Sequence, residues 1–164
     1  MSTLIVYAGK YGCTEKCVQT LAAQIKDPVE IVNLRRDAVP DLSAFDSVIV
    51  GGSIYFGQFQ KACQQFCRDR LSELKLKKLG LFICCGNFEN TEQFLAAAFP
   101  AELLEHAAAK AGFGGELSMD QMSPLDRFVT KMITRASLKE GKPLPSIRWD
   151  AIGQFSETIN RQVV

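Results

Sequence analysis

The chain has 164 residues and a formal net charge of +1; 47% of its residues are hydrophobic and 23% are charged. This length and composition fit one folded domain over residues 1–164 and exclude a mainly disordered chain. The near-neutral charge argues against a nucleic-acid partner. No signal-peptide pattern opens the sequence, and no apolar run reaches the ~20 residues of a membrane-spanning helix, so we expect a cytoplasmic protein.

Strand-like and helix-like segments alternate along the chain. Apolar runs predict strands at residues 4–7, 29–34, 47–51 and 79–85, with 116–119 as the candidate fifth strand. The strand at 29–34 is the most polar and is expected near a sheet edge. Helical spacing predicts helices at residues 14–25, 59–74, 100–111, 125–138 and 149–162. This alternation predicts an α/β fold with a parallel sheet between two layers of helices, and ligands bind such sheets beyond the carboxyl ends of the strands.

The loop after the first strand has the composition of a phosphate-binding turn. Its sequence is Ala8-Gly9-Lys10-Tyr11-Gly12-Cys13-Thr14, and a helix follows it directly. Glycines let the backbone approach an anion, and the start of a helix offers unpaired N–H groups. The spacing matches neither a P-loop nor a dinucleotide fingerprint. An ordinary strand-to-helix turn is the alternative interpretation.

Residues 5–14 resemble the FMN-phosphate signature of the flavodoxin family. The resemblance implies a flavodoxin-like three-layer sandwich whose five-stranded parallel sheet has the order 2-1-3-4-5, with FMN as cofactor. It also implies that the phosphate is held by the loop residues Gly9, Lys10, Tyr11, Gly12, Cys13 and Thr14. Gly9 and Tyr11 stand where the family usually has hydroxyl residues, so a flavodoxin-like scaffold without flavin remains an alternative.

Two further loops are expected to hold the flavin ring. After the third strand, the resemblance implies that one group of residues packs against the isoalloxazine ring: Ser53, Ile54, Tyr55, Phe56 and Gly57. Either Tyr55 or Phe56 would stack on it. After the fourth strand, the resemblance implies a second wall that faces the pyrimidine edge, formed by Cys85, Gly86, Asn87 and Phe88.

Residues 50–59 are similar to a Gly-x-Ser-Ile-x-aromatic-Gly stretch of menaquinone-dependent protoporphyrinogen oxidases, a group of flavodoxin-like FMN proteins. Residues 125–128 and 149–150 resemble their C-terminal segment. The resemblance implies an oxidoreductase whose redox centre is the flavin, with a quinone or a redox protein as partner. An electron carrier without its own substrate is the alternative, although carriers of the flavodoxin family are typically acidic. The sequence leaves the oligomeric state open.

The segment 125–138 predicts an amphipathic helix. Its apolar face comprises Leu125, Phe128, Val129, Met132, Ile133 and Ala136, and a basic stripe comprises Arg127, Lys131, Arg135 and Lys139. Such a helix either packs on the core with a solvated basic side or docks on an acidic partner or the anionic inner face of a membrane. Most amphipathic helices pack on the core, but the sequence does not separate the two alternatives, because both use the same apolar face.

The six cysteines and the single histidine are not expected to carry chemistry. Cys63 and Cys67 continue an apolar helix stripe, and buried cysteine behaves as a small hydrophobic residue. No metal site is predicted, because structural zinc ligands usually come from knuckles rather than helix faces. His106 is expected on the exposed side of its helix, where it cannot serve a catalytic triad.

Overall fold

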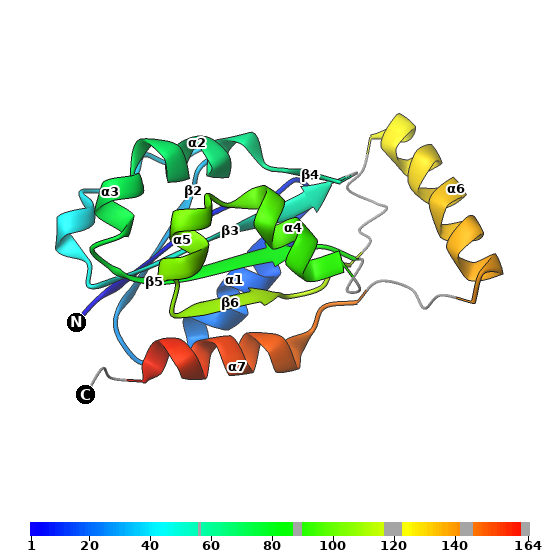
Figure 1. Cartoon of the computed structure of the whole chain (residues 1–164). Helices are drawn as coiled ribbons and strands as arrows, with labels where there is room; N and C mark the ends of the chain where they lie inside the picture. Colours follow the sequence, from blue (N-terminus) through cyan, green and yellow to red (C-terminus); the bar gives the residue numbers. More distant parts are fainter. Residues whose placement is uncertain (56, 87–89, 117–122, 142–145, 162–164) are drawn as a thin grey trace.

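Five parallel strands form the centre of the structure (Figure 1). The structure is a computed structural model, which describes residues 1–55, 57–86, 90–116, 123–141 and 146–161. The strands are β1 (Thr3–Ala8), β2 (Val29–Asn33), β3 (Ser47–Tyr55), β5 (Lys78–Cys84) and β6 (Ala109–Gly112). They lie in the order β2-β1-β3-β5-β6. Numbered as parallel strands alone, this is the predicted order 2-1-3-4-5, which is confirmed.

Helices cover both faces of the sheet, which confirms the three-layer α/β architecture (Figure 1). One face carries α1 (Cys13–Gln24) and α7 (Trp149–Asn160). The other carries α2 (Lys61–Asp69), α3 (Leu71–Leu74), α4 (Thr91–Ala98) and α5 (Ala101–His106). A short 3-10 helix, η1 (Leu42–Ala44), precedes β3. Helix α6 (Pro124–Lys139) stands away from both layers, beyond the carboxyl edge of the sheet.

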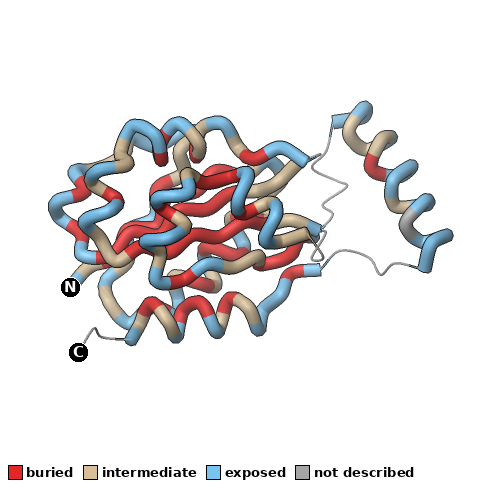
Figure 2. The backbone as a smooth tube through the Cα atoms, viewed as in Figure 1, coloured by how far each residue is buried: buried red, intermediate tan, exposed pale blue. Residues whose placement is uncertain are grey.

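The central strands are apolar because both of their faces are buried. In β1, Leu4 and Val6 pack in the core under α2, α4 and α5, whereas Ile5 and Tyr7 pack in the core under α1 and α7. Side chains alternate between faces along a strand, so two cores require a continuous apolar run. Strand β2 lies at the edge, as its polar sequence predicted, and part of it is exposed (Figure 2).

The fifth strand was predicted in the wrong place. The helix expected over residues 100–111 ends at His106, and β6 follows it and pairs with β5 from Gly80↔Ala109 to Ile83↔Gly112. Alanine favours helix by propensity, but here the strand pairing outweighs it, together with the burial of Phe113, whose ring stacks on Phe82 with centroids 4.7 Å apart. Residues 117–119 of the expected strand lie outside the described residues.

The helix expected over residues 59–74 is three separate elements. It begins with β4 (Gln58–Phe59), which pairs antiparallel with the end of β3. Helices α2 and α3 follow, separated at Arg70, whose φ of −114° and ψ of 18° leave the helical region. Helix α4 was not predicted, although Phe94, Leu95 and Ala98 have helical spacing and pack on the core.

The ring of Phe82 packs directly against Gly51. A Cβ built at Gly51 would lie 2.2 Å from the ring of Phe82, its partner on β5. We expect Gly51→Ala to lower the free energy of unfolding by about 2 kcal/mol or more, because the packed ring must move. Urea unfolding measures this change.

Gly153→Ala is the matched control, because Gly153 lies within helix α7 with nothing near its Cβ position. There the same substitution is expected to stabilise the protein by up to about 1 kcal/mol. Equal effects of the two substitutions would contradict the packing of Phe82 on Gly51.

Candidate functional site

The three loops singled out in the sequence meet at one edge of the sheet. Ala8 at the end of β1 pairs with Gly52 of β3, and Ser53 pairs with Cys84 at the end of β5. The chain leaves β1 toward β2 on one side and later returns to β3 on the other, so the strand order reverses between β1 and β3. This switch point is where parallel α/β sheets place their ligands.

The first loop forms a tight turn around Thr14. Gly12 has a φ of 86° immediately before α1, a conformation that favours glycine. A Cβ at Gly9 would lie 2.8 Å from Cβ of Thr14 and 2.9 Å from its Oγ1. The departure from the family pattern at Gly9 therefore has a steric reason, because a side chain there would collide with Thr14.

The hydroxyl of Thr14 is buried without a partner. Thr14 is 1% exposed, and its Oγ1 makes no hydrogen bond with any described residue. An unpaired buried hydroxyl costs free energy, and a bound phosphate oxygen in this loop would supply the missing partner. The loop itself is held by Arg35 in the turn after β2, whose Nη1 donates to the carbonyl oxygen of Gly9 at 3.0 Å. The local sequence gave no signal for this role of Arg35.

The second loop is a β-hairpin. Strand β3 extends past the expected end at Gly51 to Tyr55 and turns back through Gly57, whose φ is 77°, into β4. Ser53, Ile54 and Tyr55 are therefore strand residues, and Phe56 lies outside the described residues. Gln60, which no sequence pattern indicated as a site residue, donates from Nε2 to Oγ of Ser53 at 2.9 Å.

The third loop is described only in part. Cys85 is half-buried and Gly86 is exposed, whereas Asn87 and Phe88 lie outside the described residues. A Cβ at Gly115 would lie 2.9 Å from the backbone nitrogen of Gly86, so the segment after β6 packs closely on this loop.

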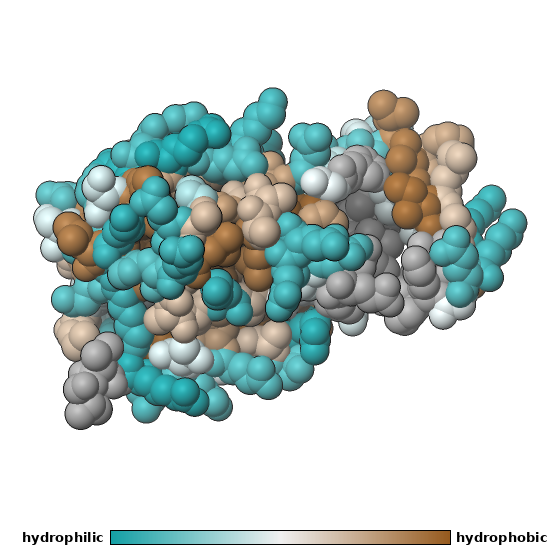
Figure 3. Space-filling model, in the orientation of Figure 1, coloured by the Kyte–Doolittle hydropathy of each residue, from teal (hydrophilic) through white to brown (hydrophobic). Residues whose placement is uncertain are grey.

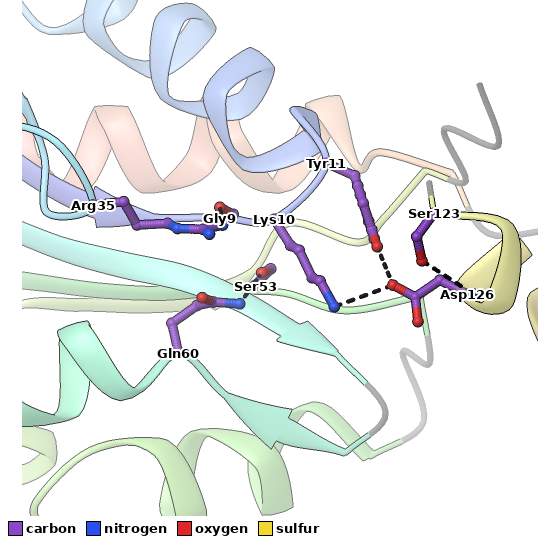
Figure 4. A network of polar contacts seen from close by, with 8 residues as sticks. All are labelled: Gly9, Lys10, Tyr11, Arg35, Ser53, Gln60, Ser123 and Asp126. Atoms are coloured by element: carbon purple, nitrogen blue, oxygen red, sulfur yellow. Dashed lines mark hydrogen bonds and ion pairs between the residues drawn. The ribbon is translucent and has the colours of Figure 1, made fainter. Parts of the chain in front are cut away.

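A polar cluster joins the first two loops to helix α6 (Figure 4). Nζ of Lys10 lies 3.2 Å from Oδ2 of Asp126, and the Tyr11 hydroxyl donates to the same oxygen. The ammonium group of Lys10 also lies 4.0 Å from the ring centroid of Tyr55, and Tyr11 meets that ring edge-on at 5.5 Å. Lys10, Tyr11 and Tyr55, all predicted site residues, are thus in direct contact.

The cluster shifts the pKa values of its members. Hydrogen bonds from Tyr11 and Tyr55, with a smaller contribution from Lys10, lower the pKa of Asp126 to about 2. Burial is the first cause that raises the pKa of Tyr55, and its hydrogen bonds within the cluster add to this effect. In the sequence, Asp126 belongs to the stretch 125–128, and no local pattern placed it near the first loop. Its place at the site follows from the structure alone.

The cysteines lie mainly in the two cores. Cys17, Cys63, Cys67 and Cys84 are buried, and Cys13 and Cys85 are half-buried. Burial raises the pKa of Cys67 to about 12, so its thiol is protonated near neutral pH. His106 is exposed, as expected, and its Nε2 lies 2.8 Å from the carbonyl oxygen of Lys77.

Helix α6 does not pack on the core, so the packed alternative is wrong for this helix. Leu125, Phe128 and Met132 are 72%, 63% and 58% exposed, and Ile133 and Leu138 are exposed by half or more. Figure 3 shows the hydrophobic residues gathered along one side of the helix. None of the helices in the described ranges combines the length and the apolar character that crossing a bilayer requires.

Comparison with known proteins places these features in a family. The flavodoxin domain model matches residues 4–143. Protoporphyrinogen IX dehydrogenase [quinone] of Escherichia coli K12 is 29% identical over 173 residues, covering 97% of this chain and 94% of the relative. This family match supports a flavin as the cofactor.

Two solved flavodoxins share the fold. One from the domain Archaea has a TM-score of 0.56 at 12% identity and covers 98% of this chain and 100% of its own. A second, from Streptococcus pneumoniae TIGR4, has a TM-score of 0.54 at 16% identity and covers 97% of both chains. With the sheet order, the switch-point loops and a family match over most of its length, the chain belongs to the flavodoxin domain family.

Proposed function

We propose that this chain binds FMN at the three loops and acts as an FMN-dependent oxidoreductase with a quinone as electron acceptor. The observation that carries the proposal is the buried Thr14 hydroxyl beneath Gly9, at the switch point of the sheet, which has no hydrogen-bond partner in the described part of the chain. Thr14 lies in the first turn of α1, where helix N–H groups and the helix dipole favour an anion.

Each part of the site has a separate role in this proposal. The phosphate is held by Gly9, Lys10, Tyr11, Gly12, Cys13 and Thr14. The ring packs against Ser53, Ile54, Tyr55, Phe56 and Gly57, and its pyrimidine edge faces Cys85, Gly86, Asn87 and Phe88. FMN, when bound, supplies the redox chemistry, and the protein binds and orients it and limits its contact with water.

The Thr14 hydroxyl gives the sharpest test of flavin binding. We expect Thr14→Val to weaken FMN binding about tenfold, the effect of one lost hydrogen bond to a charged group, while riboflavin binding stays unchanged. Flavin fluorescence titration measures both affinities. Because the hydroxyl has no partner among the residues that the structure describes, the substitution is not expected to lower the free energy of unfolding.

Thr3→Val is a matched control for this test. Thr3 is also fully buried, and its hydroxyl likewise has no partner among the described residues, but it lies at the opposite end of β1. FMN affinity that falls equally in both variants, or in neither, contradicts the proposed role of Thr14. Wild-type protein that takes up no FMN would leave only the flavin-free scaffold.

The choice of a quinone acceptor rests on the Escherichia coli relative, whose name pairs protoporphyrinogen IX with a quinone and which aligns over nearly its whole length. An electron carrier without its own substrate is the second candidate. The exposed apolar and basic surface of α6 favours the oxidoreductase, because a lipid-soluble acceptor requires contact with a membrane.

Turnover separates these two candidates. We expect FMN-loaded protein to oxidise protoporphyrinogen IX with menadione as acceptor, measured by the fluorescence of the porphyrin product under anaerobic conditions. Thr14→Val is expected to lose activity at limiting FMN and to regain it at saturating FMN. No turnover with menadione, together with rapid reduction of the flavin by a flavodoxin reductase, would instead identify a carrier.

The proposal further includes peripheral contact of α6 with the anionic inner face of a membrane. Lys131, Arg135 and Lys139 are exposed on the same helix as the exposed side chains of Phe128 and Met132. An interfacial helix combines apolar burial with electrostatic attraction in this way. We therefore assign α6 to a lipid surface rather than to a second protein.

Vesicle sedimentation tests this contact. Binding to vesicles rich in phosphatidylglycerol is expected to fall about tenfold or more when Lys131 and Arg135 are both changed to Glu, since each basic residue near such a surface contributes about 1 kcal/mol. Binding to neutral phosphatidylcholine vesicles is expected to be weak throughout. Lys61→Glu with Arg68→Glu, the same charge change on exposed residues of α2, is the control. An equal loss in both pairs would show a non-specific charge effect and exclude α6 as the docking helix.

A further inference from the structure

Asp126 links helix α6 to the proposed phosphate loop. Its Oδ2 receives the Tyr11 hydroxyl and lies 3.2 Å from Nζ of Lys10 (Figure 4). Its side chain is 19% exposed, whereas the acidic partners in the other ion pairs of the described chain are 41% exposed or more. Ser123 fixes the start of the helix, because its Oγ accepts a hydrogen bond from the backbone nitrogen of Asp126.

Lys10 and Tyr11 are therefore shared between two roles. We propose that Asp126 is a positioning residue of the flavin site, whose carboxylate competes with the cofactor phosphate for Lys10 and Tyr11. This inference rests on the proposed binding of FMN, and it adds a residue and a coupling that the proposed function does not contain.

The competition follows from the donors that each side chain carries. A tyrosine hydroxyl has one proton, so a hydroxyl that donates to Asp126 cannot donate to a phosphate oxygen at the same time. Lys10 has three donors but one charge, and its ammonium is held between Asp126 and the ring of Tyr55. Two anions on one lysine repel each other, which raises the free energy of the state in which both are bound.

The same contact holds the first turn of α6. No other helix or strand in the described part of the chain packs broadly against α6. A phosphate that draws Lys10 and Tyr11 away from Asp126 leaves this carboxylate with the hydrogen bond from Tyr55 and therefore loosens the amino end of this helix. FMN binding and the stability of the amino end of α6 are therefore coupled through the carboxylate of Asp126.

Asp126→Asn tests the competition with little change in size. We expect this variant to bind FMN about threefold to tenfold more tightly, in the range of one hydrogen bond or partly exposed ion pair, while riboflavin affinity changes less than about twofold. Glu102→Gln is the matched control. Glu102 also accepts from one lysine, Lys75 at 2.9 Å, but on α5, away from the carboxyl edge. Unchanged or weaker FMN binding in Asp126→Asn overturns the proposal, and so does an equal gain for FMN and riboflavin.

Hydrogen exchange of α6 supplies a readout that does not depend on activity. Amides of α6 that begin its hydrogen-bonded ladder, starting with Arg127, whose N–H donates to the carbonyl oxygen of Ser123, are expected to exchange faster in Asp126→Asn than in the wild type without flavin. Saturating FMN, but not riboflavin, is expected to produce the same increase in the wild type. Slower exchange of α6 on FMN binding would overturn the coupling.

The two proposals fail in different ways. If neither the wild type nor Asp126→Asn binds FMN, the proposed function and the competition both fail. If both bind FMN with equal affinity, the function stands and the competition is overturned. Equal α6 exchange in the two proteins without flavin overturns the part of the proposal that ties α6 to Asp126.

Discussion

The parallel pairing of β1 with β3, buried on both faces, determines where the other parts of this molecule lie. All of β1 is buried, and its partners on β3 run in register from Ser47 to Gly52. Two parallel strands end at the same edge, so this pairing places the first loop beside the hairpin after β3. Glycines at Gly51 and Gly52 allow the close approach, since a Cβ at Gly52 would lie 2.8 Å from the carbonyl oxygen of Ala8.

The fold was predictable where burial determines the sequence pattern. The runs at residues 4–7, 47–51 and 79–85 are apolar because each strand contributes to two cores, and all three strands were found. Strand β6 has the sequence Ala-Lys-Ala-Gly, without such a run, and its small residues suit a helix equally well. Only its pairing with β5 and the burial of the following Phe113 define it as a strand, and both are contacts between distant parts of the chain.

In the candidate site too, features with a local sequence pattern were predictable, and features that depend on contacts between distant residues were not. The turn between β1 and α1 was predictable because glycines, a helix start and Thr14 occur together within a few residues. Asp126 and Arg35 approach that loop from other elements, and their charges resemble those of any exposed residue in the sequence. The steric reason for a glycine at position 9 also depends on the three-dimensional structure, because Thr14 collides with a Cβ there only in this backbone conformation.

Helices α6 and α7 show why an amphipathic pattern does not by itself predict burial. Both carry apolar residues at helical spacing, yet Ile152 and Phe155 of α7 lie in the core, and Phe128 and Met132 of α6 are exposed. Burying a large apolar side chain is worth about 1.5–3 kcal/mol, so α6 gains from any partner that covers it. In the proposed function, its basic residues favour an anionic surface among such partners. Asp126 is the acidic exception in the first turn, and it faces the loop after β1. In the proposed function, the cations of α6 meet a membrane surface and its one carboxylate meets the flavin site, which is the charge arrangement required for one helix to respond to both.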